Sequence, residues 1–180
     1  MNSSSIAPSL LLGLLAFGLD RLHKFFQVSA DCIGAPSSAC VDFTTAFTTQ
    51  NWQHWRGGEI VPVTGFFDYV LVWNTGVSYG LLGGLPVWVL GVVAVAAIAA
   101  LSIWWLRTAD TLVRIGLSLC IGGALSNALD RLLYGAVADF FHFHWQDYSF
   151  YIFNVADVAI TLGVLLLLLD LVGIGRRKPV

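Results

Sequence analysis

The sequence has few charged residues, and this shortage limits the classes of protein to which it can belong. Only 11% of its 180 residues are charged, whereas a soluble domain has about 25%. The 9 Lys and Arg and the 11 Asp and Glu leave a net charge of −2, which excludes the basic surface of a nucleic-acid-binding protein. Because 57% of the residues are hydrophobic, intrinsic disorder is excluded as well. The composition therefore predicts one integral membrane domain, residues 1–180, without a nucleic-acid partner.

Long apolar runs, in contrast, are abundant. A helix that crosses the hydrocarbon core needs about 20 residues, and four stretches meet this length. They cover approximately residues 6–28, 85–106, 111–132 and 151–174. The first stretch is expected to stay as a helix and not to be cleaved as a signal peptide, because no basic residue precedes it. We therefore predict an all-α membrane fold with four transmembrane helices.

The distribution of Lys and Arg predicts the orientation. Arg107 and Arg114 flank the connection between the second and third stretches, and three basic residues follow the fourth, at 176–178. Cytoplasmic loops are enriched in such residues, so both regions are predicted to be cytoplasmic. With four crossings, both termini then lie in the cytoplasm. The segment of about 29–84 faces the outside.

The second half of this outer segment predicts a small extramembrane β structure. Ile60–Val63 and Phe66–Trp73 are rich in β-branched and aromatic residues, and Pro62 and Gly65 interrupt them. Its first half, approximately residues 30–58, is polar and predicts a loop.

Cysteine is scarce, with three in the whole chain. Cys32 and Cys40 lie in the outer segment, and a disulfide between them is possible if that side is oxidising, with two free thiols as the alternative. Cys120 lies inside the third apolar stretch and is expected to act as a small packing residue.

The polar residues of the apolar stretches gather toward one end. With a rise of about 1.5 Å per residue, each falls near the outer boundary of its predicted helix. An ionisable side chain in a membrane segment must face the helix bundle and is a functional candidate by default. This predicted outer layer contains Asp20, Lys24, Asn74, Asn127, Asp130, Arg131, Asp139, Asn154 and Asp157.

Two of these acids differ from the others. Asp20 with Lys24 and Asp130 with Arg131 are expected to form structural ion pairs, whereas Asp139 and Asp157 have no base next to them in the sequence. Two carboxylates at one depth predict a dyad in which one keeps its proton and the other stays ionised. Such a pair can activate water and protonate a leaving amine, which is peptide hydrolysis.

Two alternatives remain open at this point. His142 and His144 would lie on one side of a strand, as a metal pair requires, with Asp139 or Asp147 as a third ligand, although we expect no metal. A small transporter or channel would also use intramembrane polar residues, but it should carry them at the midplane or on both sides of it.

Several blocks of sequence are similar to the motifs of one family. D-R-L-H-K at 20–24 is similar to D-Q-x-x-K, and N-T-G-V-S-Y-G at 74–80 to N-x-G-x-A-F-G. G-G-A-L-S-N-A-L-D-R at 122–131 resembles G-G-A-x-G-N-x-x-D-R, and G-A-V-A-D-F at 135–140 follows as G-x-V-x-D-F. F-N-V-A-D at 153–157 matches F-N-x-A-D. In these blocks the chain resembles the lipoprotein signal peptidases (signal peptidase II), the bacterial intramembrane aspartyl proteases.

The resemblance implies roles for individual residues. Asp139 and Asp157 match the catalytic aspartates, and Asp130 matches an acid that is expected to be structural. Other residues of the matched blocks are expected to line the active site or to contact substrate or inhibitor. These are Asp20, Lys24, Asn74, Gly76, Asn127, Arg131 and Asn154.

The resemblance also implies a substrate and a location. The expected substrate is a prolipoprotein that carries diacylglycerol on its lipobox cysteine and is cut just before that cysteine. The enzyme is expected to be a monomer among the phospholipids of the bacterial inner membrane, with its site at the periplasmic face beside a small β-cradle. No metal or cofactor is expected, and the antibiotic globomycin is the implied inhibitor.

The chain departs from the family pattern in some places. Arg21 replaces Gln, Ser78 and Tyr79 replace Ala and Phe, and Ser126 replaces Gly. The stretch of about 31–58 is longer than the usual loop, and the resemblance implies no role for it.

Overall fold

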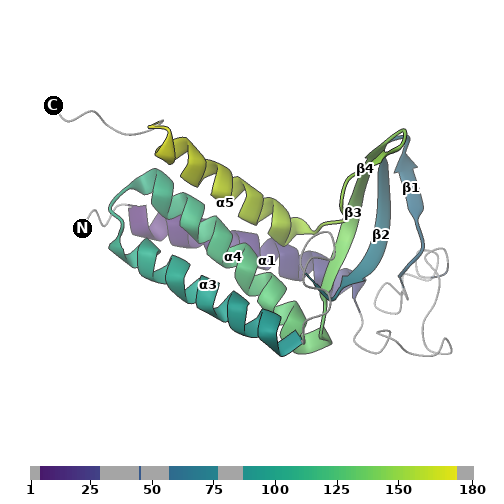
Figure 1. Cartoon of the computed structure of the whole chain (residues 1–180), viewed down its shortest axis with the longest axis horizontal. Coiled ribbons are helices and arrows are strands. Elements are labelled where there is room, and N and C mark those ends of the chain that lie inside the picture. Colours follow the sequence, from purple (N-terminus) through teal and green to yellow (C-terminus); the bar gives the residue numbers. More distant parts are fainter. Residues whose placement is uncertain (1–4, 29–44, 46–56, 77–86, 174–180) are drawn as a thin grey trace. The chain divides into compact units, whose positions relative to one another are not determined.

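The structure contains four long helices and four short strands (Figure 1). It is a computed structural model that describes residues 5–28, 45, 57–76 and 87–173. Cys32 and Cys40 lie outside the described residues. The helices are α1 (Ile6–Gln27), α3 (Val87–Arg107), α4 (Thr111–Tyr134) and α5 (Val155–Leu171). The strands are β1 (Val61–Thr64), β2 (Phe67–Asn74), β3 (Val137–Trp145) and β4 (Tyr148–Ser149).

Three of the described helices are long and apolar enough to cross a membrane: Ile6–Gln27, Trp88–Arg107 and Thr111–Tyr134. Their outward-facing side chains are apolar, as lipid contact requires; Leu14 is 60% exposed and Val92 61%. The prediction of a helical membrane protein is confirmed with these three candidate spans. Because α5 has only 17 residues, the fourth crossing stays a prediction.

Helix α5 is shorter than predicted at both ends. The predicted start near residue 151 was wrong because Phe153 is paired with β3: its carbonyl accepts the N–H groups of Phe140 and Phe141, and its own N–H donates to Phe141. The helix ends before Gly173, whose φ of 83° breaks the helical path. The predicted end near residue 174 was therefore also too late.

The strands form one antiparallel sheet in the order β1-β2-β3-β4. The two strands predicted in the outer segment are confirmed as β1 and β2, and β3 with β4 completes the sheet as a hairpin. Asp139 lies opposite Val72, and a β-bulge interrupts the register between Tyr69 and Val72. The sheet thus gives Asp139 a fixed position on a paired strand rather than on a loop.

A small core of Val28, Leu71, Ala138 and Phe140 supports this sheet. Tyr69 packs against it and contacts the ring of His23, with 3.0 Å between its hydroxyl and Nε2. Burial raises the pKa of Tyr69 above its ordinary value, so the hydroxyl stays protonated in this hydrogen bond with His23.

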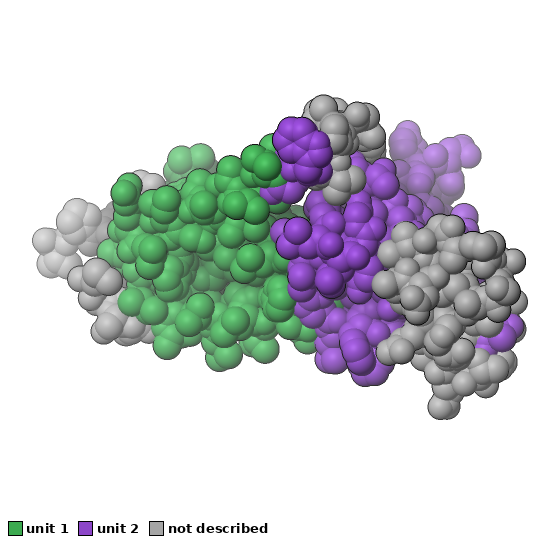
Figure 2. All heavy atoms as spheres, turned by 90° about the horizontal axis from the view of Figure 1, so that it is seen from below, with its two compact units in different colours: residues 1–20, 92–127, 155–180 green, residues 21–91, 128–154 purple. Residues whose placement is uncertain are grey.

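The chain divides into two compact units (Figure 2). Unit 1 consists of Met1–Asp20, Val92–Asn127 and Val155–Val180. Unit 2 consists of Arg21–Gly91 and Ala128–Asn154 and contains the sheet. The boundary falls inside α1, α3 and α4, so these three helices contribute residues to both units. The single domain expected from the sequence stays a prediction.

In unit 1, α4 packs against its neighbours through glycine. A Cβ on Gly122 would lie 2.2 Å from the carbonyl oxygen of Gly13 in α1. A Cβ on Gly123 would lie 2.5 Å from the carbonyl oxygen of Ala156, and one on Gly163 2.5 Å from that of Gly116. Membrane helices use small residues in this way, because lipid gives no hydrophobic driving force and close backbone contact must replace it.

Arg114 joins the beginnings of α1 and α4. Its side chain is 1% exposed. Nη1 donates to Ser5 Oγ at 2.5 Å, Nη2 donates to the carbonyl of Thr108, and the guanidinium carbon lies 5.7 Å from the centre of the Trp105 ring. Asp110 caps α4, since its Oδ1 accepts the N–H groups of Leu112 and Val113.

The glycine contacts predict the effect of one added methyl group. Gly122→Ala should destabilise the protein by about 1–3 kcal/mol, because the Cβ overlaps the backbone of α1 and the helices must separate. Gly91→Ala is the matched control, since a Cβ there meets nothing within 4 Å, and it should leave stability equal or slightly higher. Thermal unfolding of the purified protein in detergent measures both variants. Equal unfolding temperatures would contradict the close packing.

Candidate active site

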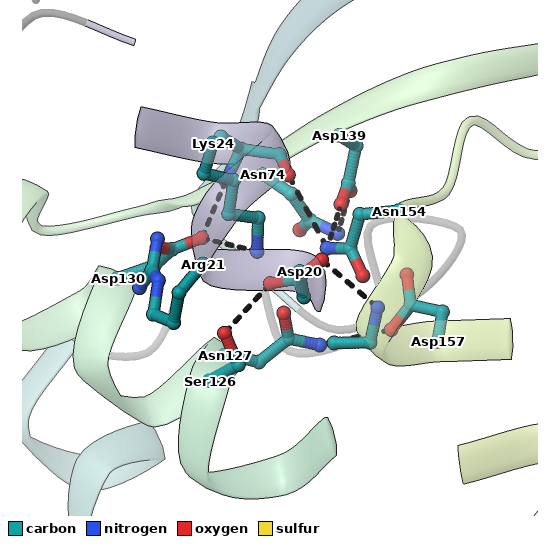
Figure 3. Close-up of polar contacts among 12 residues, drawn as sticks. Asp20, Arg21, Lys24, Asn74, Ser126, Asn127, Asp130, Asp139, Asn154 and Asp157 are labelled. Atoms are coloured by element: carbon teal, nitrogen blue, oxygen red, sulfur yellow. Dashed lines mark hydrogen bonds and ion pairs between the residues drawn. The ribbon is translucent and has the colours of Figure 1, made fainter. Parts of the chain in front are cut away.

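In unit 2, two asparagines hold Asp139 (Figure 3). Asn74 Nδ2 donates to Asp139 Oδ2 at 3.0 Å, and Asn154 Nδ2 donates to Oδ1 at 2.7 Å. Asn154 also donates to the carbonyl of Ala138 at 3.2 Å. Asp139 is 2% exposed and Asn154 is fully buried. Each oxygen of the carboxyl group thus has its own amide donor.

The turn after β2 orients Asn74. The N–H of Gly76 donates to Asn74 Oδ1 at 3.0 Å, which leaves Nδ2 as the end of the amide that faces Asp139. Arg131 Nη2 donates to the carbonyl of Gly76 at 3.0 Å, so the arginine fixes the same turn. Gly76 and Arg131 therefore act on Asp139 through Asn74.

Asp130 is in contact with two cationic side chains of unit 2. Lys24 Nζ lies 2.6 Å from its Oδ2, and Arg21 Nη2 lies 2.7 Å from its Oδ1. The side chains of Lys24 and Asp130 have no exposed area. Asp130 Oδ2 also accepts the N–H of Ala138 at 3.2 Å, directly before Asp139. Asp130 thus contacts the backbone directly before Asp139.

The sequence grouped these charges differently. It paired Asp130 with Arg131, the next residue, whereas the structure shows contacts of Asp130 with Lys24 and Arg21; the expected pair of Asp20 with Lys24 stays a prediction. Consecutive helix residues point in different directions, so proximity in the sequence is a poor guide to such contacts. Arg21, a departure from the family pattern, supplies the second cation for Asp130.

In unit 1, Asp20 is buried without exposed area. Its Oδ2 accepts the hydroxyl of Ser126 at 2.6 Å, and its Oδ1 accepts the N–H of Ala156 at 2.9 Å. Ala156 lies in the first turn of α5, where the helix leaves N–H groups unsatisfied and favours negative charge. Ser126 is another departure from the pattern, and like Arg21 it has a definite partner.

Asp157 lies in the same first turn of α5 and is partly buried. Asn127 of α4 donates to it, with 2.9 Å between Nδ2 and Oδ1. As with Asp139, a neutral amide holds the carboxyl group. Asp20 contacts the residues directly before both members of this pair, Ser126 and Ala156.

The predicted site residues thus form two groups, one in each unit. The group in unit 2 contains Lys24, Asn74, Gly76, Asp130, Arg131, Asp139 and Asn154. The group in unit 1 contains Asp20, Asn127 and Asp157.

The metal alternative has no support among the described residues, which include no group of three His, Cys, Asp or Glu that could hold an ion. The rings of His142 and His144 do stack on one side of β3, 5.4 Å apart. The carboxylate in contact with both is Asp68, not predicted from the sequence. Cys120 is buried with a free thiol, which fits its predicted packing role.

Comparison with known proteins gives the family. The family model described as Signal peptidase (SPase) II matches residues 35–173. A lipoprotein signal peptidase of Methylorubrum extorquens (strain PA1) is 48% identical over 130 residues, which are 71% of this chain and 72% of that protein. One of Rhodopseudomonas palustris (strain TIE-1) is 52% identical over 118 residues, 62% of this chain and 72% of that protein.

Solved structures agree with this result. A bacterial membrane enzyme solved by the in meso method at 2.3 Å resolution has a TM-score of 0.72 and 25% identity, with 97% of this chain and 95% of that chain covered. A second, at 1.9 Å resolution, has a TM-score of 0.66 and covers 93% of this chain and 94% of that chain. The motifs, the amide-held aspartates and the family model lead to one conclusion: the chain belongs to the signal peptidase II family, a family of membrane proteases.

Proposed function

We propose that this enzyme removes the signal peptide from prolipoproteins that carry diacylglycerol on the lipobox cysteine, and that Asp139 and Asp157 form its catalytic dyad. Family membership supports the reaction, and relatives that share about half of their residues with this chain in the aligned region are named lipoprotein signal peptidases. Because the family consists of proteases, a transporter or channel is no longer needed to explain the polar residues of the membrane segments. The protein is a bacterial inner-membrane protein.

The observation that carries the residue assignment is the chemistry of the groups around the two aspartates. The donors described for Asp139 are the amides of Asn74 and Asn154, and the donor described for Asp157 is the amide of Asn127. A cation would favour the ionised carboxylate strongly. An amide is uncharged, so it orients the carboxyl group with a weaker preference for the ionised form. This suits a pair that must hold one proton and exchange it.

The proposed reaction uses these carboxyl groups as base and acid. The ionised aspartate takes a proton from water, and the resulting nucleophile attacks the scissile carbonyl carbon. The protonated aspartate donates to the carbonyl oxygen, and a proton then passes to the departing amine. The roles and the shared proton belong to the pair, so either residue can titrate first. The C–N bond breaks as the protonated amine leaves, all protons move between water, peptide and carboxyl groups, and no cofactor is needed.

Asp20, Lys24, Asn74, Gly76, Asn127, Arg131 and Asn154 are proposed to build and line this site. The contacts of these residues give them different tasks in the proposed site. The three asparagines orient the dyad, Arg131 and Gly76 fix the turn of Asn74, and Asp20 holds the N-terminal turn of α5. Lys24 forms an ion pair with Asp130, so this buried carboxyl group has a cation beside it.

We also propose four membrane crossings, with α5 as the fourth. Its 17 residues reach the lower limit of about 17–25 for a transmembrane helix. Four crossings place the termini together in the cytoplasm, where the basic tail at 176–178 belongs. The dyad then lies at the periplasmic face. The protein is proposed to work as a monomer among phospholipids, within one domain, and to be sensitive to globomycin.

The dyad predicts the effect of removing either acid. Asp139→Asn and Asp157→Asn should each lower cleavage by about 100- to 10,000-fold or more, because an amide can neither accept nor supply the catalytic proton. The assay is cleavage of a diacylglyceryl prolipoprotein in detergent, followed by mass spectrometry. Asp170→Asn in α5 is the matched control and should keep wild-type activity. Retained cleavage in either dyad variant, with the protein folded, would refute the assignment.

The absence of metal from the proposed reaction gives a second test. Incubation with 1,10-phenanthroline or EDTA should leave the cleavage rate unchanged, because carboxyl groups alone move the protons. The same assay measures this. Inhibition that zinc reverses would instead implicate His142 and His144.

The proposed topology predicts the behaviour of fusions at the C-terminus. A fused green fluorescent protein should be fluorescent and a fused alkaline phosphatase inactive, because α5 returns the chain to the cytoplasm. Fusions after Arg107 serve as the reference for a cytoplasmic position. An active phosphatase at the C-terminus would mean that α5 does not cross.

A further inference from the structure

Asp68, His142, His144 and Ser149 form a second polar cluster in unit 2. It lies on the sheet: Asp68 in β2, the two histidines in β3 and Ser149 in β4. The contacts described among these four side chains include neither Asp139 nor the asparagines that hold it. The cluster is therefore distinct in its contacts from the proposed proteolytic site, and nothing in the proposed protease reaction uses it.

The sheet register brings the four side chains together. Asp68 is paired with His142, and His144 with Ser149, so Ser149 is the diagonal neighbour of His142. The hairpin between β3 and β4 is tight, with Gln146 at φ 51°. This turn fixes Ser149 in the register that faces the histidines.

The contacts link the hydroxyl of Ser149 to the imidazole of His142, and this imidazole to the carboxylate of Asp68. Ser149 Oγ lies 2.7 Å from His142 Nε2, and His142 Nδ1 lies 3.1 Å from Asp68 Oδ2. Asp68 is 7% exposed, whereas Ser149 is exposed to the surroundings. A longer contact of 3.4 Å leads from Ser149 Oγ to the carbonyl of Phe150. A buried acid, a bridging imidazole and an accessible hydroxyl have the connectivity of a nucleophilic triad.

The acid also sets the tautomer of the base. A neutral His142 that donates from Nδ1 to Asp68 must accept at Nε2, which is the nitrogen that faces Ser149. His144 Nε2 lies 3.2 Å from the same carboxylate oxygen, Asp68 Oδ2, without the geometry of a hydrogen bond, and its ring stacks on that of His142. His144 thus packs beside both members of the relay.

A donor for a developing oxyanion is present on the same strand. The N–H of Phe150 donates to the carbonyl of Phe143 at 2.8 Å. Hydrogen-bonded and non-hydrogen-bonded pairs alternate in an antiparallel ladder. The pair of Phe143 with Phe150 is hydrogen-bonded, so the neighbouring pair of His144 with Ser149 is non-hydrogen-bonded. The N–H of Ser149 therefore points away from β3, where it can bind the oxygen of a carbonyl group that its own Oγ attacks.

We propose that Ser149 is the nucleophile of a second hydrolytic site, which takes carboxylic esters. Ser149 is exposed on the edge strand, so an ester can reach its hydroxyl, and the relay supplies the base that acyl transfer requires. Ser149 Oγ bonds to the ester carbon while its proton passes to His142 Nε2, and the ester C–O bond breaks as the alcohol leaves with that proton. Water then attacks the acyl-serine, again with His142 as base, and releases the carboxylic acid and free Ser149.

A fluorophosphonate probe tests this proposal on the full chain in detergent. The probe phosphonylates an activated serine, so wild-type protein should be labelled and the label should map to Ser149 by peptide mass spectrometry. Ser149→Ala should abolish labelling, and it should lower kcat/KM for p-nitrophenyl butyrate at least about 100-fold. His142→Asn should reduce both signals by a similar factor.

The controls separate this site from the proposed protease. Asp139→Asn should lose prolipoprotein cleavage and keep the label, whereas Ser149→Ala should do the reverse. Ser149 is exposed, so its truncation to Ala leaves the fold intact even if the histidine variant fails to fold. Absence of labelling in the wild type, or equal labelling of Ser149→Ala, would overturn the proposal and leave the cluster with a structural role.

Discussion

A buried carboxylate holds the peptide N–H directly before each of the two proposed catalytic aspartates. Asp130 accepts the N–H of Ala138, which precedes Asp139, and Asp20 accepts the N–H of Ala156, which precedes Asp157. Both supporting acids have no exposed area. Removal of such a group from water costs several kcal/mol unless partners replace its hydration. The rest of each unit supplies these partners.

The two supporting acids are satisfied in different ways. Asp130 has two cations, Lys24 and Arg21, because the end of α1 reaches it in unit 2. The partners described for Asp20 are a hydroxyl and the N–H of a helix terminus, where the helix dipole assists. Ala138 and Ala156 are both fully buried, so the small side chain allows the backbone to approach a carboxylate. The supporting acids thus fix the backbone before each proposed catalytic aspartate, and the asparagine amides contact its carboxyl group.

The helices could be predicted from the sequence because their signal is local. The starts of α1 and α4 were predicted correctly, since long apolar runs determine them. The start of α5 was not, because Phe153 pairs with Phe141, a contact that no local pattern contains. The two aspartates were singled out because neither has a neighbouring base in the sequence, and their catalytic role stays a proposal. The contacts of Lys24 with Asp130 and of Asp68 with His142 were not predicted, since both join elements that are distant in the sequence.

The three asparagines that contact the two proposed catalytic aspartates can lose this function through a small chemical change. Asn and Asp have almost the same shape, but only Asn donates from its end group, whereas ionised Asp accepts. Hydrolysis of one side-chain amide would therefore replace a donor with a third carboxylate against Asp139 or Asp157, and one base change in a codon has the same result. The full burial of Asn154 and the Gly76 contact on Asn74 restrict the motion that such hydrolysis requires. The proposed activity thus depends on three intact side-chain amides as well as on the two aspartates.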